Sequence, residues 1–160
     1  MSKLFNPFPP LLADFYKFTH PDQYPVKTEY VYTNCTARSS RIDGVNEVIV
    51  FNIQYLIEEY LINVWNEGFF SKPKEEVIAK YKRFCDNTLG KNSISVHRLE
   101  ALHDLGYLPL HIKALPEGTR CPLQVPFMTI RNTDARFYWL TNFVETLTQT
   151  VIWQPMTSAT

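Results

Sequence analysis

The chain has 160 residues, 45% of them hydrophobic and 20% charged, which is typical of a single globular unit. Its 16 basic and 16 acidic residues balance, so the chain lacks the overall positive field that attracts nucleic acid or an anionic membrane. Three cysteines without a CxxC pair support neither a zinc site nor a disulfide framework, and we expect a cytoplasmic protein with reduced cysteines.

Prolines dominate the beginning of the chain. Pro7, Pro9 and Pro10 exclude regular structure there, and two further prolines interrupt the segment before residue 26. We therefore predict an extended arm over residues 1–25, followed by a mixed strand-and-helix unit over residues 26–160. The arm has no apolar run suited to a signal peptide, and no stretch approaches the roughly 18 apolar residues of a membrane span.

The first half of the unit predicts strands and then helices. β-branched and aromatic residues at 29–33 indicate a strand, and 47–51 indicates a short buried strand or the run into a helix. An amphipathic helix ending near Gly68 follows. Its apolar stripe consists of Ile53, Leu56, Ile57, Tyr60, Leu61, Val64 and Trp65.

Two more helices are expected next. We predict that Ser71 caps a helix ending at Gly90, with acidic residues in its first turn, and that a shorter helix over 96–105 stops at Gly106.

The second half of the unit predicts two strands and a long helix. Alternation over 108–114 indicates a strand, and 125–131 indicates another, which its prolines confine to a sheet edge or to a strand's start. Thr133 or Asp134 should cap a long helix that Pro155 stops. The fold class is therefore mixed α/β, without repeats or linkers.

Two segments are candidates for chemistry near the start. Leu11–His20 places Asp14 close to aromatic, cationic and imidazole side chains, although the residue types alone favour Asp14 as a helix cap with packed aromatics. Arg38 and Arg41 could grip a phosphate with paired N–H donors, and two solvated arginines in a loop are the alternative.

Two later segments favour structural roles. In Lys113–Thr119 one glycine suits a tight turn better than a phosphate loop. In the Asn132–Thr146 region, Asn142 and Glu145 are three residues apart on one helical face and could bond each other. The four histidines lack metal-ligand spacing, and no nucleotide-binding or hydrolase motif is present, so the residues alone leave function open.

Taken together, the motifs resemble the nicotinamide phosphoribosyltransferase family from about residue 11 to the last residue. The matching text is Leu11–Asp14 with Tyr16–Lys17 and Thr19–His20, Gln23–Pro25, Val31–Tyr32 leading to Arg38, Phe51, Gln54–Tyr55, Tyr60–Leu61, Lys113–Gly118, Asn132–Asp134, Tyr138–Asn142, Glu145–Thr146 and Ala159–Thr160. Several motifs in one order are more specific than any one of them.

The resemblance implies an enzyme that joins nicotinamide to phosphoribosyl pyrophosphate with magnesium, giving nicotinamide mononucleotide and pyrophosphate. It also implies a homodimer in which the N-terminal segment of one subunit reaches the site of the other. Relatives run to several hundred residues, so we expect this chain to be an N-terminal portion without the catalytic barrel, inactive alone, and contributing no catalytic or metal-binding residue. A non-catalytic interaction module and a nicotinate-using relative remain alternatives.

The resemblance assigns three substrate-binding residues. Tyr16 matches the tyrosine that stacks on nicotinamide from the partner chain, and Asp14 matches the acidic residue near the pyridine amide. Arg38 matches an arginine that contacts substrate phosphates across the interface. Phe15 departs from the small polar residue that many relatives carry there, and the stretch between Tyr32 and Arg38 diverges.

Overall fold

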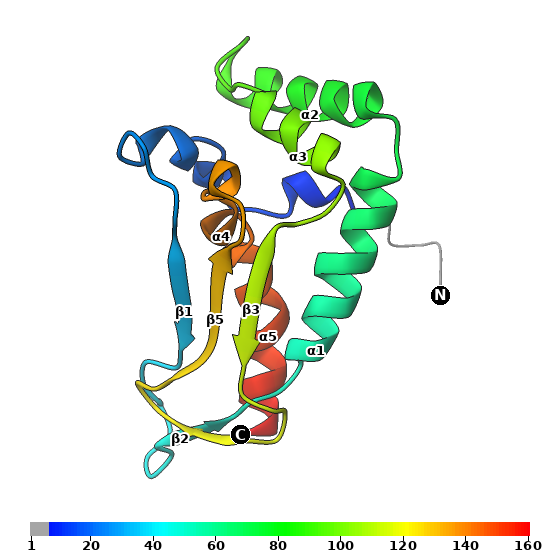
Figure 1. The fold of residues 1–160 in the computed structure, drawn as a ribbon. Coiled ribbons are helices and arrows are strands. Elements are labelled where there is room, and N and C mark those ends of the chain that lie inside the picture. Colours follow the sequence, from blue (N-terminus) through cyan, green and yellow to red (C-terminus); the bar gives the residue numbers. More distant parts are fainter. Residues whose placement is uncertain (1–6) are drawn as a thin grey trace.

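The computed structural model describes residues 7–160, so the first six residues of the predicted arm lie outside the described part (Figure 1). The elements in chain order are η1 (Pro9–Leu11), η2 (Phe15–Phe18), η3 (His20–Gln23), β1 (Tyr32–Thr36), β2 (Glu47–Ile49), α1 (Ile53–Tyr55), η4 (Leu56–Val64), η5 (Asn66–Phe70), α2 (Lys74–Leu89), α3 (His97–Leu105), β3 (Leu110–Ala114), β4 (Arg120–Pro122), β5 (Pro126–Asn132), η6 (Ala135–Phe137), α4 (Leu140–Phe143) and α5 (Glu145–Ala159). Mixed helices and strands confirm the predicted fold class.

The main sheet has three antiparallel strands in the order β1-β5-β3, with α5 running along it in Figure 1. The strands predicted at 108–114 and 125–131 are confirmed to within two residues. Pro126 occupies the first position of the central strand, where a missing N–H is tolerated.

The strand predicted at 29–33 lies three residues later, at β1. The side chain of Asn132 explains the shift, because it accepts a hydrogen bond from the Val31 amide (2.9 Å) and donates one to the Glu29 carbonyl (2.8 Å). These backbone groups are thus satisfied by a side chain instead of a strand partner.

A second sheet pairs β2 with β4, and the turn before β4 serves the first helix. Gly118 has a φ of +83°, which favours glycine. Glu117 Oε1 accepts a hydrogen bond from the Gln54 amide (2.9 Å) in the first turn of α1. The Lys113–Thr119 segment is therefore a turn that also caps a helix from a distance.

The amphipathic helix is confirmed as a continuous element from α1 through η4 and η5, with wide π-type turns over most of its length. Gly68 permits close packing of the arm, because a Cβ there would lie 2.7 Å from Pro9 Cδ and 2.9 Å from the Pro7 carbonyl oxygen. The prediction that Ser71 caps the next helix was wrong. Pro73 holds that position and no side chain caps it, while Ser71 ends η5.

The last helix also differs from expectation. Asp134 does accept a bond from the Arg136 amide (2.9 Å), but it begins only the short η6, and α4 and α5 follow as separate helices. Pro155 lies inside α5 and does not stop it. Proline removes the hydrogen bond to the carbonyl four residues earlier, and here the Asn52 side-chain amide donates to that carbonyl, Val151 O, at 3.0 Å.

We predict that Asn52 and Pro155 are energetically coupled. Because Asn52 has a φ of +71°, Asn52→Gly keeps the backbone conformation and removes only the hydrogen bond. It should lower the free energy of unfolding by about 1 kcal/mol in the wild type and by only a few tenths in a Pro155→Ala background, where the alanine supplies a backbone N–H. Urea unfolding of the four proteins measures the coupling, and equal losses in both backgrounds would exclude it.

The described residues form two apolar clusters, one that includes residues of the arm and one that includes residues of α5. One cluster packs Phe8 and Phe18 of the arm against α2, α3 and the end of the first helix. The other packs β5 and α5 against the beginning of the first helix. Through these contacts the arm is part of the folded unit. It is not extended as predicted, since its described residues form three short 3₁₀ turns.

Candidate functional site

The arm meets the first turn of α5 through Asp14. The Asp14 amide donates to Thr146 Oγ1 (3.1 Å), and the same hydroxyl donates to Asp14 Oδ2 (2.7 Å). The Tyr16 hydroxyl also donates to Oδ2 (3.0 Å). The hydrogen bonds from Thr146 and Tyr16 lower the pKa of the Asp14 carboxyl below its usual 3.8. The stability that these bonds contribute is therefore fully present above pH 3.8, and it is lost as the pH falls through the lowered pKa.

Tyr16 is half exposed, with a relative solvent-accessible surface of 52%. Its ring centroid is 4.9 Å from that of His20, and Lys17 Nζ lies 5.2 Å from the ring centre. The hydrogen bond to Asp14 raises the pKa of the Tyr16 phenol, which therefore stays protonated at neutral pH. Exposed ring area remains available for stacking on a planar ligand.

A second contact between the arm and α5 is an ion pair. Lys17 Nζ lies 2.5 Å from Glu145 Oε2, and the lysine side chain is 4% exposed while that of Glu145 is 41% exposed. Further along the arm, the Tyr24 hydroxyl accepts a hydrogen bond from the Asn142 amide. The expected bond between Asn142 and Glu145 is therefore replaced by separate bonds from each of them to the arm.

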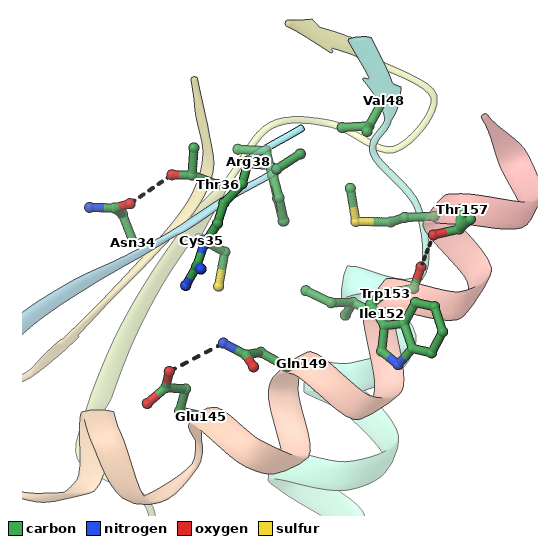
Figure 2. Close-up of a pocket in the computed structure, with 13 residues that line it drawn as sticks. Asn34, Cys35, Thr36, Arg38, Val48, Glu145, Gln149, Ile152, Trp153 and Thr157 are labelled. Atoms are coloured by element: carbon green, nitrogen blue, oxygen red, sulfur yellow. Dashed lines mark hydrogen bonds between the residues drawn. The ribbon is translucent and has the colours of Figure 1, made fainter. Parts of the chain in front are cut away.

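Arg38 lines a cavity of about 530 Å³ between the end of β1 and α5 (Figure 2). Its side chain reaches from the strand end into the cavity, toward the helix that carries Glu145 and Gln149. Trp153, 60% exposed, and apolar residues of α5 complete the helical wall. The cavity thus offers a guanidinium, amide and carboxylate groups, and an exposed aromatic surface.

Glu145 belongs both to the contact between the arm and α5 and to the wall of the cavity that Arg38 lines. It pairs with Lys17 beside Tyr16, and it also lines the cavity that contains Arg38. The structure brings Asp14 and Tyr16 into direct contact and places Arg38 on the neighbouring cavity. Arg41 is exposed and does not line this cavity, so the two arginines do not form the expected pair there.

Sequence reasoning missed two residues of this region, Gln149 and Trp153, which line the cavity. Thr146 belonged to a candidate segment, but its contact with Asp14 was not foreseen. Glu145, Gln149 and Trp153 are four residues apart, a spacing that places them on one helical face and could have identified the wall.

Cys35 lies in the cavity wall with a suppressed reactivity. Burial, and then the negative charge of Glu145, raise the pKa of its thiol from 9.0 to about 11. Only the thiolate attacks electrophiles, so at pH 8 roughly one molecule in a thousand is reactive.

We predict slow alkylation of Cys35 whose rate rises about tenfold per pH unit through pH 10. Iodoacetamide labelling of a Cys85→Ala/Cys121→Ala protein, followed by mass spectrometry, isolates this thiol. Because the pKa is raised, the rate at any pH below it should lie under that of an unfolded control. A plateau near pH 9 would contradict the assigned environment.

Comparisons with known proteins identify a family and relatives that the chain resembles. The family described as "Nicotinamide phosphoribosyltransferase, N-terminal domain" matches residues 10–112. The chain is 51% identical over 152 residues to the nicotinamide phosphoribosyltransferase of Acinetobacter baylyi, covering 92% of this chain and 30% of that protein. It is 32% identical over 150 residues to the protein of the same name from Xanthomonas campestris pv. campestris, covering 94% of this chain and 30% of that one.

A solved structure agrees on the fold. The crystal structure of human nicotinic acid phosphoribosyltransferase superposes with a TM-score of 0.65 at 16% identity, over 91% of this chain and 26% of that chain. The chain thus spans about 30% of the length of these bacterial relatives. Because the family match takes in more than half of the sequence, the chain belongs to the nicotinamide phosphoribosyltransferase family, whose N-terminal domain it carries.

Proposed function

We propose that this chain is the N-terminal part of an enzyme that forms nicotinamide mononucleotide and pyrophosphate from nicotinamide and phosphoribosyl pyrophosphate, a step of NAD salvage. The observation that carries the proposal is the half-exposed Tyr16 ring, held by Asp14, beside a cavity into which Arg38 reaches. A relative with 51% identity carries the name of this enzyme.

The reaction requires an aromatic clamp and bound phosphates. The pyridine nitrogen forms a bond to the anomeric carbon while the bond from that carbon to pyrophosphate breaks, and the leaving group takes the electron pair. Positive charge develops on the sugar, so the site must hold both reactants aligned. In our proposal Tyr16 stacks on the pyridine and Arg38 donates to phosphate oxygens.

Asp14 supports an amide as the pyridine substituent. Both hydrogen bonds to its carboxylate within residues 7–160 end on Oδ2, which leaves Oδ1 as an acceptor. A carboxamide N–H can donate to that oxygen, whereas the carboxylate of nicotinate would be repelled. Nicotinamide is therefore the proposed acceptor, and assays with both pyridines test it.

Magnesium is expected to accompany phosphoribosyl pyrophosphate. Among the described residues no group of three or more His, Cys, Asp or Glu side chains could hold a metal ion. Mg²⁺ is usually held by one or two carboxylates together with substrate phosphates. We propose that the phosphates of phosphoribosyl pyrophosphate hold the ion.

A homodimer in the cytoplasm, with the arm reaching the partner's site, completes the proposal. Exposed aromatic side chains on the arm and on the stretch at β1 support an interface there; they are Phe15, Tyr16, Tyr30 and Tyr32. Over residues 7–160 no helix has the length and apolarity to cross a membrane. A monodisperse monomer in light scattering, at high concentration and with the rest of the enzyme present, would count against the dimer.

Reconstitution tests the proposed activity. The chain should show no turnover alone and should form nicotinamide mononucleotide when the remaining region of the Acinetobacter baylyi relative is supplied in trans or fused to it. In that assembly Tyr16→Ala should raise KM for nicotinamide about twofold to tenfold. Arg38→Ala should raise KM for phosphoribosyl pyrophosphate about tenfold to a hundredfold.

Matched variants separate binding from general damage. Tyr16→Phe keeps the stacking ring but loses the hydrogen bond to Asp14, so its KM for nicotinamide should lie between those of the wild type and Tyr16→Ala. Arg41→Ala removes an exposed arginine outside the cavity. The alternative is a non-catalytic interaction module that binds through the exposed aromatic side chains of the arm and of β1. A stable assembly that binds a full-length relative without altering nucleotide formation would support that alternative and contradict ours.

A further inference from the structure

Two consecutive residues at the start of α5 hold the segment of the arm that contains Tyr16. Thr146 bonds both the amide and the carboxylate of Asp14, at 3.1 Å and 2.7 Å, so the backbone and side chain of Asp14 are fixed together. Glu145 binds Lys17 Nζ at 2.5 Å, and the lysine is nearly fully buried. Tyr16 lies between these two anchored positions.

The phenol of Tyr16 is tied to α5 through Asp14. Its hydroxyl donates to Oδ2, the same carboxylate oxygen that accepts from Thr146. The lowered pKa of Asp14 and the raised pKa of Tyr16 have these hydrogen bonds as their main causes. Thr146 therefore contacts Asp14, which in turn contacts Tyr16. The ion pair of Lys17 with Glu145 fixes the arm independently, one residue after Tyr16.

We propose that Thr146 is a positioning residue for the transfer reaction, which fixes the orientation of the Tyr16 ring through Asp14 without touching substrate. This inference rests on the proposed function for its kinetic consequence, but the geometric part concerns this chain alone. Its hydroxyl is suited to the role because one oxygen both accepts from the Asp14 amide and donates to the Asp14 carboxylate.

Preorganisation predicts the form of the kinetic effect. An exposed tyrosine that samples several rotamers must lose that freedom when it stacks on a ligand, which weakens binding. If Tyr16 contacts the pyridine equally in the ground and transition states, loss of Thr146 changes KM and leaves kcat unchanged. Immobilising one side chain corresponds to about a twofold to tenfold change in affinity.

The first measurement uses the chain itself. Nuclear Overhauser contacts between the rings of Tyr16 and His20, whose centroids are 4.9 Å apart, report the orientation, with Tyr16→Phe for assignment. Thr146→Val removes the hydroxyl and should weaken these contacts at least twofold, whereas Thr146→Ser should retain them. Thr150→Val is the matched control, since among residues 7–160 the Thr150 hydroxyl one turn later bonds only the Thr146 carbonyl (2.8 Å).

The second measurement uses the reconstituted enzyme described above. Thr146→Val should raise KM for nicotinamide about twofold to fivefold, and by no more than Tyr16→Ala does, with kcat within twofold, and Thr146→Ser should restore KM. Unchanged ring contacts in Thr146→Val overturn the inference even when the wild type is fully active, and so does a fall in kcat that matches the rise in KM. Weakened contacts in a protein that never forms nucleotide refute the proposed function and leave the positioning geometry supported.

Discussion

Replacing Glu145 with alanine should lower the free energy of unfolding by about 2–3 kcal/mol. The substitution leaves the Lys17 ammonium, 4% exposed, without its partner inside the protein. Breaking a fully buried pair costs about 3–5 kcal/mol, and the 41% exposure of Glu145 reduces that figure. Urea unfolding followed by tryptophan fluorescence measures the loss, and limited proteolysis should show the arm cut faster than in the wild type.

An exposed ion pair provides the control for Glu145. Lys74 and Asp104 lie 2.7 Å apart with side chains 37% and 62% exposed, and Asp104→Ala should leave the unfolding midpoint unchanged. Glu145→Gln keeps an acceptor for Lys17 and should fall between the wild type and Glu145→Ala. If Glu145→Ala behaves like Asp104→Ala, the buried pair does not anchor the arm.

Replacing Asn132 with alanine should cost about 3 kcal/mol. This side chain is 3% exposed and makes three hydrogen bonds to the backbone, to Val31, Glu29 and Asp134, at 2.8–3.0 Å. Alanine leaves the Val31 amide and the Glu29 carbonyl without these partners in a half-buried region. It also removes one of two bonds to the Asp134 carbonyl, which still accepts from the Phe137 amide (3.0 Å), and each lost bond should cost about 1 kcal/mol. Chemical unfolding measures the loss, and amide exchange at Val31 should accelerate.

Asn132→Asp tests the two hydrogen bonds that the Asn132 amide donates, without a change in side-chain size. Aspartate keeps the acceptor for the Val31 amide but places negative charge against two carbonyl oxygens, so it should also destabilise, although it has the same size. Asn63→Ala is the control, since Asn63 is exposed and its side chain donates a hydrogen bond to Glu59 (3.3 Å) and to no other residue of the described part of the chain. A protein in which Asn132→Asp is as stable as the wild type would show that the donated bonds contribute nothing.

Local patterns predicted most of the secondary structure. The apolar stripe from Ile53 to Trp65, the glycines that end α2 and α3, and the alternation around β3 were all visible in the sequence, because periodicity and backbone preference act over a few residues. Pro126 at the start of β5 followed the same kind of rule.

Two of the errors arose where a distant residue changed a local rule. Pro155 does not end α5, because Asn52 from another part of the chain satisfies the carbonyl that proline leaves without a donor. β1 begins late because Asn132, about a hundred residues away, binds the preceding backbone. No local window contains both partners of either contact, so tertiary structure decides these cases.

The sequence predicted three residues of the candidate site, but it did not predict the contacts that connect them. Asp14, Tyr16 and Arg38 came from the resemblance, while the residue types alone left their roles open. Their link through Glu145 and Thr146 depends on the docking of the arm against α5, which spacing in the sequence does not reveal. The substrate roles of these three residues remain predictions.

A crystal structure of the reconstituted assembly with bound nicotinamide mononucleotide tests the central claim most directly. That claim is that the arm and the end of β1 complete a substrate site whose remaining part lies outside this sequence. We expect the Tyr16 ring within about 4.5–7 Å of the pyridine ring centre and an Arg38 nitrogen within about 2.7–3.2 Å of a phosphate oxygen. A bound nucleotide with both side chains turned away from it would contradict the account.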